Sequence, residues 1–184
     1  MALGRVPYAS LATLLRRELA SEEDPETAKL MEALGHVRRR GWFSRAEFLR
    51  MCRWKSPRAI RHCRRNSTAT VRRVSRAALA TTSEQQRLVL LTGLHGVSVP
   101  TASAILTLVN PRRYGVLDIR AWQLLFGLGR VGRKPAGQGF VVRDWLDYLA
   151  ELRRHARRLG VTARAVEYTL FLCHRKFQKG RLYA

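Results

Sequence analysis

The sequence predicts an all-α fold. Apolar residues recur three and four positions apart along most of the chain, which is the spacing of helices, and strand-like alternation is rare. Two such apolar segments, 88–94 and 100–109, are separated by a short Gly-Val-Ser turn. Pro100 fits the start of the second segment, because a first-turn residue needs no intrahelical partner for its N–H. We therefore expect a helix, a tight turn and a second helix over about 84–109.

The N-terminal part of the chain carries signals for where two helices begin and end. Ser10 is a suitable N-cap for a short helix over 11–20. Asp24 and Pro25 fit the cap and first position of another helix, whose last turn is rich in arginine and ends at Gly41. We expect this second helix to continue without interruption from Pro25 to the residue before Gly41.

Further capping patterns place the remaining helices. Ser44 with Glu47, and Ser83 with Gln86, form capping-box patterns, and Ser56 followed by proline opens another short helix. The other expected helices cover 68–80, 119 to about 128, 143–159 and 162–177, and the glycine-rich stretch 130–139 is expected to be a mobile loop. That stretch matches no phosphate-binding loop, because no strand precedes it and no Lys-Ser/Thr pair follows.

Composition bounds the class of protein and of partner. A chain of 184 residues with 46% hydrophobic residues can fill the core of one domain or of two small lobes. Its 35 lysines and arginines against 13 acidic residues give a net charge of +22, which attracts polyanions. Most of this charge is arginine, which grips phosphates through a planar fork. Nucleic acid is the leading expected partner; an anionic membrane surface, or a merely solvated basic surface, is the alternative.

The cysteines and histidines indicate no cofactor and no metal. Cys52, Cys63 and Cys173 are too scattered for a disulfide framework, a zinc site or an iron–sulfur cluster, and we expect them to be buried. The five histidines have neither metal-ligand nor catalytic-triad spacing. No secretory signal and no apolar run of transmembrane length is present. We expect a cytoplasmic monomer that does not contact a membrane, with no protein partner implied.

Residues 91–102 read Leu-Thr-Gly-Leu-His-Gly-Val-Ser-Val-Pro-Thr-Ala, and Asp118 lies eighteen residues after Pro100. This pattern resembles the helix-hairpin-helix of the HhH-GPD superfamily of DNA glycosylases, whose hairpin is roughly L-x-x-L-P-G-V-G-x-K-T-A. Members place a catalytic aspartate at a similar distance after the lysine. The segment from Val116 to Trp122 is most similar to the 8-oxoguanine branch, and 166–174 is similar to the closing helix of endonuclease III.

The resemblance implies a two-lobed HhH-GPD-like fold. Residues 22–117 would form a helical barrel lobe ending in the hairpin, and residues 1–21 with 118–184 a second lobe, with the active cleft between them. Asp118 would be the catalytic carboxylate, which stabilises the positive charge that develops on the sugar and orients the attacking water. Its ordinary role would be an N-cap for the next helix, and the two roles are compatible.

Two departures from the family pattern limit the implied chemistry. Pro100 stands where bifunctional members have the lysine that attacks C1′ of the sugar, and a proline has no amine. Ser98 replaces the second glycine of the turn, although it can cap the helix that follows. The resemblance therefore implies a glycosylase without β-lyase activity and without the iron–sulfur cluster of many relatives.

The candidate site residues follow from the hairpin and its basic surroundings. Asp118 is the candidate catalytic residue. The candidate DNA-binding residues are His95, Gly96, Val97, Ser98, Pro100, Thr101, Lys55, Arg58 and Arg120, and the candidate base-pocket residues are Trp122 and Trp54. A tryptophan at helical spacing is equally suited to the core, so Trp122 has that alternative. Related hairpins hold a monovalent cation through carbonyl oxygens, which the resemblance extends to this turn.

The sequence thus favours a monofunctional glycosylase of base-excision repair. It would hydrolyse the N-glycosidic bond of a damaged or mispaired base flipped out of double-stranded DNA. The alternative is a non-catalytic DNA- or RNA-binding protein that uses the hairpin for phosphate contact. Asp118 favours the enzyme, because a protein that only binds phosphates does not need that carboxylate.

Overall fold

A computed structural model describes residues 6–177, and every regular element in this range is helical, which confirms the all-α prediction. The elements are α1 (Leu11–Glu18), α2 (Pro25–Leu34), α3 (Val37–Arg40), α4 (Arg45–Lys55), the 3₁₀ turn η1 (Pro57–Ala59), α5 (Ile60–Cys63), α6 (Thr68–Ala80), α7 (Glu84–Thr92), α8 (Val99–Val109), α9 (Ile119–Gly127), α10 (Val142–Leu159) and α11 (Ala163–Phe177). None of these helices is long and apolar enough to cross a membrane.

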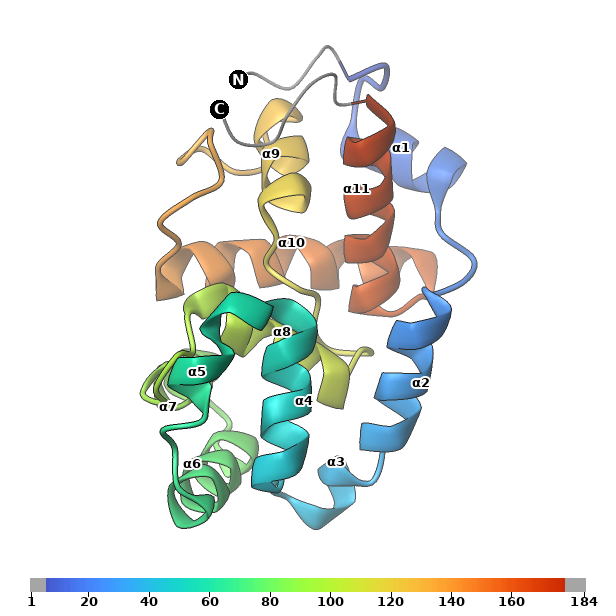
Figure 1. Ribbon diagram of the computed structural model, residues 1–184. Helices are drawn as coiled ribbons and strands as arrows, with labels where there is room; N and C mark the ends of the chain where they lie inside the picture. Colours follow the sequence, from blue (N-terminus) through green and yellow to red (C-terminus); the bar gives the residue numbers. More distant parts are fainter. Residues whose placement is uncertain (1–5, 178–184) are drawn as a thin grey trace.

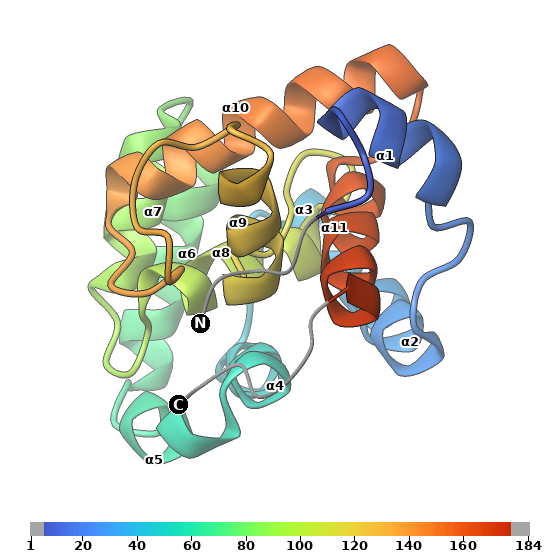
Figure 2. The ribbon, with the colours of Figure 1, turned by 90° about the horizontal axis from the view of Figure 1, so that it is seen from above.

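The helices fall into two groups in space (Figure 1). Helices α2 to α8 make up the lower part, and α1, α9 and α11 lie above them beside α10, which crosses the molecule almost horizontally. Viewed from above, α9 and α11 stand side by side, and they pack closely on each other (Figure 2). Helix α10 also packs against α7 and α8, so it joins the two groups.

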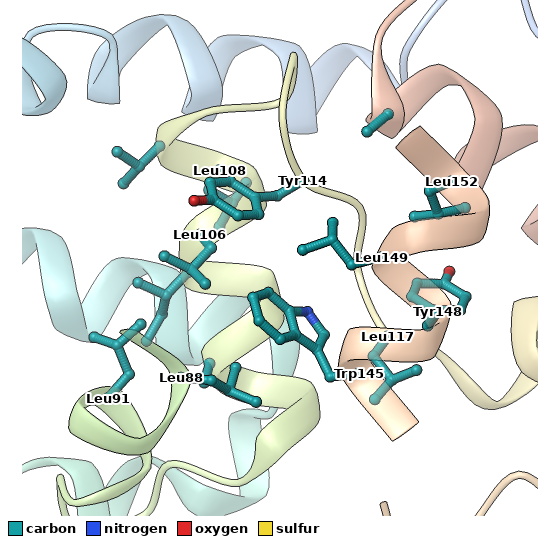
Figure 3. Close-up of a cluster of buried hydrophobic side chains, with 14 of the residues drawn as sticks. Leu88, Leu91, Leu106, Leu108, Tyr114, Leu117, Trp145, Tyr148, Leu149 and Leu152 are labelled. Atoms are coloured by element: carbon teal, nitrogen blue, oxygen red, sulfur yellow. The ribbon is translucent and has the colours of Figure 1, made fainter. Parts of the chain in front are cut away.

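The core is continuous between these groups. Figure 3 shows Leu88 and Leu91 of α7 and the leucines of α8 on one side and side chains of α10 on the other, with the rings of Tyr114 and Trp145 between them. Tyr114 and Trp145 stack with ring centroids 6.2 Å apart, and Trp145 is fully buried. Burying such aromatic side chains stabilises the fold strongly, since truncating one to alanine typically costs about 3–5 kcal/mol. The predicted division at 117/118 therefore falls inside one shared core, and it stays a prediction.

Most of the predicted helix starts are confirmed by their capping bonds. Ser10 and Asp24 accept from the third residue of their helices, with Pro25 in the first turn of α2. The capping box at Ser44 and Glu47 is complete, and α6 spans 68–80 as expected. These outcomes follow from local chemistry, because a cap and its amide partner lie within one turn of each other.

Two boundary predictions are wrong. The helix starting at Pro25 stops at Leu34, where the N–H of Gly35 bonds Glu32 and tightens the last turn; α3 follows as a separate turn, which Gly41 ends. Helix α1 stops at Glu18, not at residue 20, because the N–H of Ala20 donates to Thr169 of α11 at 3.0 Å.

The capping box predicted at Ser83 is only half present. Ser83 accepts from the N–H of Gln86, as an N-cap does. The side chain of Gln86, however, hydrogen-bonds the hydroxyl of Thr81 at 2.7 Å. The Gln86 side chain therefore bonds Thr81, which precedes the cap, and does not accept from the backbone N–H of Ser83 as a full capping box requires.

Candidate active site

The hairpin has the predicted order of helix, tight turn and helix. Helix α7 ends at Thr92, and α8 starts at Val99 with Ser98 as its N-cap and Pro100 in its first turn. The backbone N–H groups of Gly96, Ser98 and Val99 form no hydrogen bond within residues 6–177. Such free amides beside a helix N-terminus can donate to a phosphate.

Gly96 is required by both its backbone angle and its neighbours. Its φ is +78°, in the left-handed region that favours glycine. A Cβ added there would lie 2.8 Å from the backbone nitrogen of Cys63 and 2.8 Å from its sulfur. The backbone that approaches this glycine closely therefore belongs to α5, inside the protein.

Asn66 fixes the turn to α5. Its side-chain amide donates to the carbonyl of Cys63 at 2.8 Å and to that of His95 at 2.9 Å, and its oxygen accepts from the N–H of His95 at 2.9 Å. Asn66 is only 3% exposed. Sequence reasoning missed this role, because the partners are backbone groups that no side-chain pattern reveals.

Asp118 is delivered by a segment that three helices hold in place. The hydroxyl of Ser103 in α8 accepts from the N–H of Leu117 at 2.8 Å. Both backbone groups of Val116 are also bound. Its carbonyl accepts from the hydroxyl of Tyr148 in α10 at 2.9 Å, and its N–H donates to the carboxylate of Glu167 in α11 at 3.1 Å. The loop before the carboxylate therefore has little freedom to move.

Glu167 and Gly115 complete this support. A Cβ added at Gly115 would lie 2.7 Å from the Cβ of Glu167. Only glycine at this position therefore lets α11 pack this closely on the segment before Asp118. Burial raises the pKa of Glu167, although the charge of Arg164 and the N–H of Val116 oppose it. Arg164 also forms two bonds to Glu23, at 2.6 and 2.9 Å, and this joins α11 to the start of α2.

At the end of this segment Asp118 has two partners. Its Oδ1 accepts from the N–H of Arg120 at 2.9 Å, which caps α9 as predicted. Its Oδ2 lies 2.8 Å from the Nζ of Lys55, the last residue of α4. The two side chains are 22% and 19% exposed, so the ion pair is largely sheltered from water. Sequence reasoning named both residues, but it gave no reason to pair them.

The pKa of Asp118 reflects a balance of opposing effects. Burial raises it, but the charge of Lys55, the hydrogen bond from that ammonium and the N–H of Arg120 together hold it below its ordinary value of 3.8. Asp118 is therefore a carboxylate at neutral pH. A negative charge that is already oriented can stabilise positive charge as it develops nearby.

Two pockets meet at the ion pair. The first has a volume of about 540 Å³ and lies between the hairpin and α9; its walls include Lys55, Asp118, the stretch 98–101 and the stretch 137–140. The second, of about 300 Å³, lies towards α11 and also includes Lys55 and Asp118. Three aromatic residues line this second pocket, namely Trp54, Tyr168 and Phe171. Lys55 and Asp118 therefore form the boundary between the two pockets, of which the second is the more aromatic.

Two predicted site residues face the core. The side chain of Trp122 is 1% exposed, and its ring packs on Phe140 with centroids 5.1 Å apart. Its indole N–H donates to the carbonyl of Lys134 at 2.9 Å, so it anchors the loop after α9 and lines neither of the two pockets. The expectation that it forms the base pocket is corrected to a core role. Val97 is also buried, which leaves only its backbone near the turn surface.

The other predicted residues lie around the pockets. Ser98, Pro100, Thr101 and Arg58 line the first pocket, and Trp54 lines the second, where its indole N–H donates to Thr27 at 3.1 Å. His95 is exposed on the turn. The guanidinium of Arg120 lies 6.0 Å from the ring centroid of Phe171, at the edge of the second pocket.

An exposed basic strip continues from the first pocket along α5. It consists of Arg58, Arg61, Arg64 and Arg65, all of which are exposed. Arg45, by contrast, has an internal role, because it donates to the carbonyls of Asn66 and Arg64 at 2.9 and 2.7 Å. The strip thus runs from η1 through α5 to the two residues after it, a segment that Asn66 fixes to the hairpin turn.

The carbonyls of the turn have partners inside the protein. Those of Leu94, His95 and Gly96 accept hydrogen bonds from Val97, Asn66 and Cys63, and the monovalent cation expected at the turn stays a prediction. Within residues 6–177, no group of three or more His, Cys, Asp or Glu side chains is placed to hold a metal. The three cysteines are free and buried, as expected.

Comparison of the chain with known protein families, with curated proteins and with solved structures gives no significant match. The candidate site therefore rests on its own geometry and on the resemblance of the hairpin segment.

Replacing Gly96 by alanine should destabilise the protein more than the same change at Gly41. Both residues have a left-handed φ, near +78° and +75°. Nothing lies within 4 Å of a Cβ at Gly41, so the cost there is the backbone term alone, about 1 kcal/mol. At Gly96 the backbone of Cys63 must also move, so we expect a loss of about 3 kcal/mol. Urea unfolding measures both, and equal losses would contradict the packing of the turn on α5.

Replacing Lys55 by methionine should reverse the pKa shift of Asp118. Asp118 stays buried in the variant but loses the ammonium beside it, so the pKa of Asp118 should rise above 3.8. The wild-type carboxylate contributes stability at neutral pH that is lost as the pH falls through its lowered pKa. The variant should therefore be less stable than wild type by about 2 kcal/mol at pH 7 and by much less near pH 3.

Carboxyl titration by NMR and urea unfolding at the two pH values test this reversal. Lys29→Met is the matched control, because Lys29 pairs with Glu26 at 3.0 Å on the exposed surface, where such a pair contributes little. A pKa of Asp118 that stays low in Lys55→Met would show that the ammonium does not control it.

Proposed function

We propose that this chain is a DNA glycosylase of the HhH-GPD type, which releases a damaged or mispaired base from double-stranded DNA by hydrolysis. The observation that carries the proposal is the position of Asp118. It is an oriented carboxylate at the boundary of two pockets, one of which the hairpin turn also lines. A carboxylate in such a place suits a reaction that develops positive charge on a sugar.

In the proposed reaction each pocket has a role. Phosphates on either side of the flipped nucleotide would be held by the free amides of the turn and by Arg58 and Arg120. The base would leave the stack and enter the pocket lined by Trp54, Tyr168 and Phe171, whose volume of about 300 Å³ accommodates a nucleobase. Its sugar would then lie beside Asp118.

The charge distribution supports duplex DNA as the partner. The exposed strip from Arg58 to Arg65 is next to the hairpin turn in space, because Asn66, the residue after it, hydrogen-bonds that turn. Arginine contacts to phosphate carry no sequence information, so they suit a protein that must search any sequence for a lesion.

A second candidate is a non-catalytic nucleic-acid-binding protein. One observation favours it: Asp118 already caps α9 and pairs with Lys55, and both roles are structural. The proposals differ in one respect. The glycosylase needs the carboxylate in order to act, whereas the binding protein needs it only for stability.

Assays on duplexes that each contain one lesion separate the two candidates. Wild type should release the base from at least one member of a panel of oxidised, alkylated and mismatched bases, and Asp118→Asn should lose about 10³-fold or more in rate. Asparagine keeps the size and can still cap α9, so folding should be retained. Thermal unfolding checks this, and Asp147→Asn, an exposed aspartate on α10, is the matched control.

No base release from any duplex, with salt-sensitive binding intact in both wild type and Asp118→Asn, would reject the glycosylase and support the binding protein. A variant that is folded and fully active would remove Asp118 from the chemistry.

A further inference from the structure

The position of Lys55 has a chemical consequence beyond the ion pair. Its amine stands on the boundary of both pockets, with Asp118 as its partner at 2.8 Å. No other lysine in residues 6–177 lines either pocket; Lys29, Lys134 and Lys176 pair with acidic side chains elsewhere. A primary amine is thus placed where a sugar would lie, although the hairpin itself has a proline.

The amine is also constrained. Lys55 ends α4, and the next residue, Ser56, bonds back to Cys52 at 2.8 Å, so the helix end is fixed. The side chain is 19% exposed, and the carboxylate that it contacts is held through the segment that Ser103, Tyr148 and Glu167 fix. Positioning of this kind favours reaction with one bound group over general reaction with solutes.

An abasic nucleotide offers the matching reactive group. Removal of the base leaves a sugar whose open form carries an aldehyde at C1′, and amines condense with aldehydes to form imines. We propose that Lys55 forms an imine with the abasic site and cleaves the strand beside it, a lyase activity that the hairpin sequence does not imply. This rests on the proposed function, because base release at the same pocket supplies the abasic sugar.

The reaction balances without any oxidant or reductant. The amine nitrogen bonds to C1′, and the aldehyde oxygen leaves as water, which gives a protonated imine. Asp118 takes a proton from C2′, and the 3′ phosphate leaves with the electron pair of its C3′–O bond. Water then hydrolyses the imine, which restores the amine of Lys55 and leaves an unsaturated aldehyde on the cleaved strand; Asp118 returns its proton to solvent.

The test uses the full-length chain, a duplex with one abasic site made from uracil, and sodium borohydride, which reduces an imine to a stable amine. Wild type should form a covalent protein–DNA complex on a denaturing gel, and peptide mapping should place the adduct on Lys55. In Lys55→Arg the covalent band should fall to the background of the gel. Arginine keeps the charge beside Asp118 but has no primary amine, so a purely positioning role would survive this change.

Matched controls are Lys29→Arg and Lys134→Arg, which should form as much complex as wild type. Thermal unfolding confirms that each variant is folded.

An equal amount of complex in Lys55→Arg, an adduct mapped to another amine, or no complex with wild type bound to the duplex would overturn the proposal. The duplex already contains the abasic site, so this assay does not depend on base release by the protein. The lyase and the glycosylase can therefore be rejected independently. An adduct on Lys55 without base release from any lesion would sustain the lyase and reject the glycosylase. Base release without an adduct would support the glycosylase and reject the lyase.

Discussion

The ion pair between Lys55 and Asp118 is the contact on which the candidate site depends. It joins the end of α4 to the start of α9, and so connects the two groups of helices at the point where both pockets meet. Because burial alone would raise the pKa of Asp118, the ammonium keeps this carboxylate charged inside the protein. In the proposed reaction, the same contact also brings a primary amine to the place where the sugar would lie.

Buried polar side chains that bind backbone groups hold this arrangement rigid. Asn66 fixes the hairpin turn to α5, and Ser103, Tyr148 and Glu167 fix the segment before Asp118 from three different helices. A buried side chain that leaves such a bond unmade costs about 1–3 kcal/mol, so each of these bonds resists movement of the backbone. The site is therefore positioned in advance, which suits chemistry that stabilises a developing charge.

The sequence was most informative where the determinants are local. Ser44 with Glu47, Ser98 with Pro100, and Asp118 at the start of α9 were predicted because a cap and its partner lie within one helical turn. Pairings across the fold carry no comparable signal: Lys55 and Asp118 are 63 residues apart, and Asn66 binds a turn 29 residues away. Trp122 shows a further limit, because core and pocket tryptophans have the same spacing and only packing separates them.

The most direct measurement is a crystal structure of the protein bound to a duplex that carries a tetrahydrofuran abasic analogue. This analogue has no aldehyde, so it binds without reacting. We expect its sugar to lie between Asp118 and Lys55, with the neighbouring phosphates on the turn at 96–99 and beside Arg58. A duplex bound elsewhere, for example along the exposed arginines of α6, with both pockets empty, would contradict it.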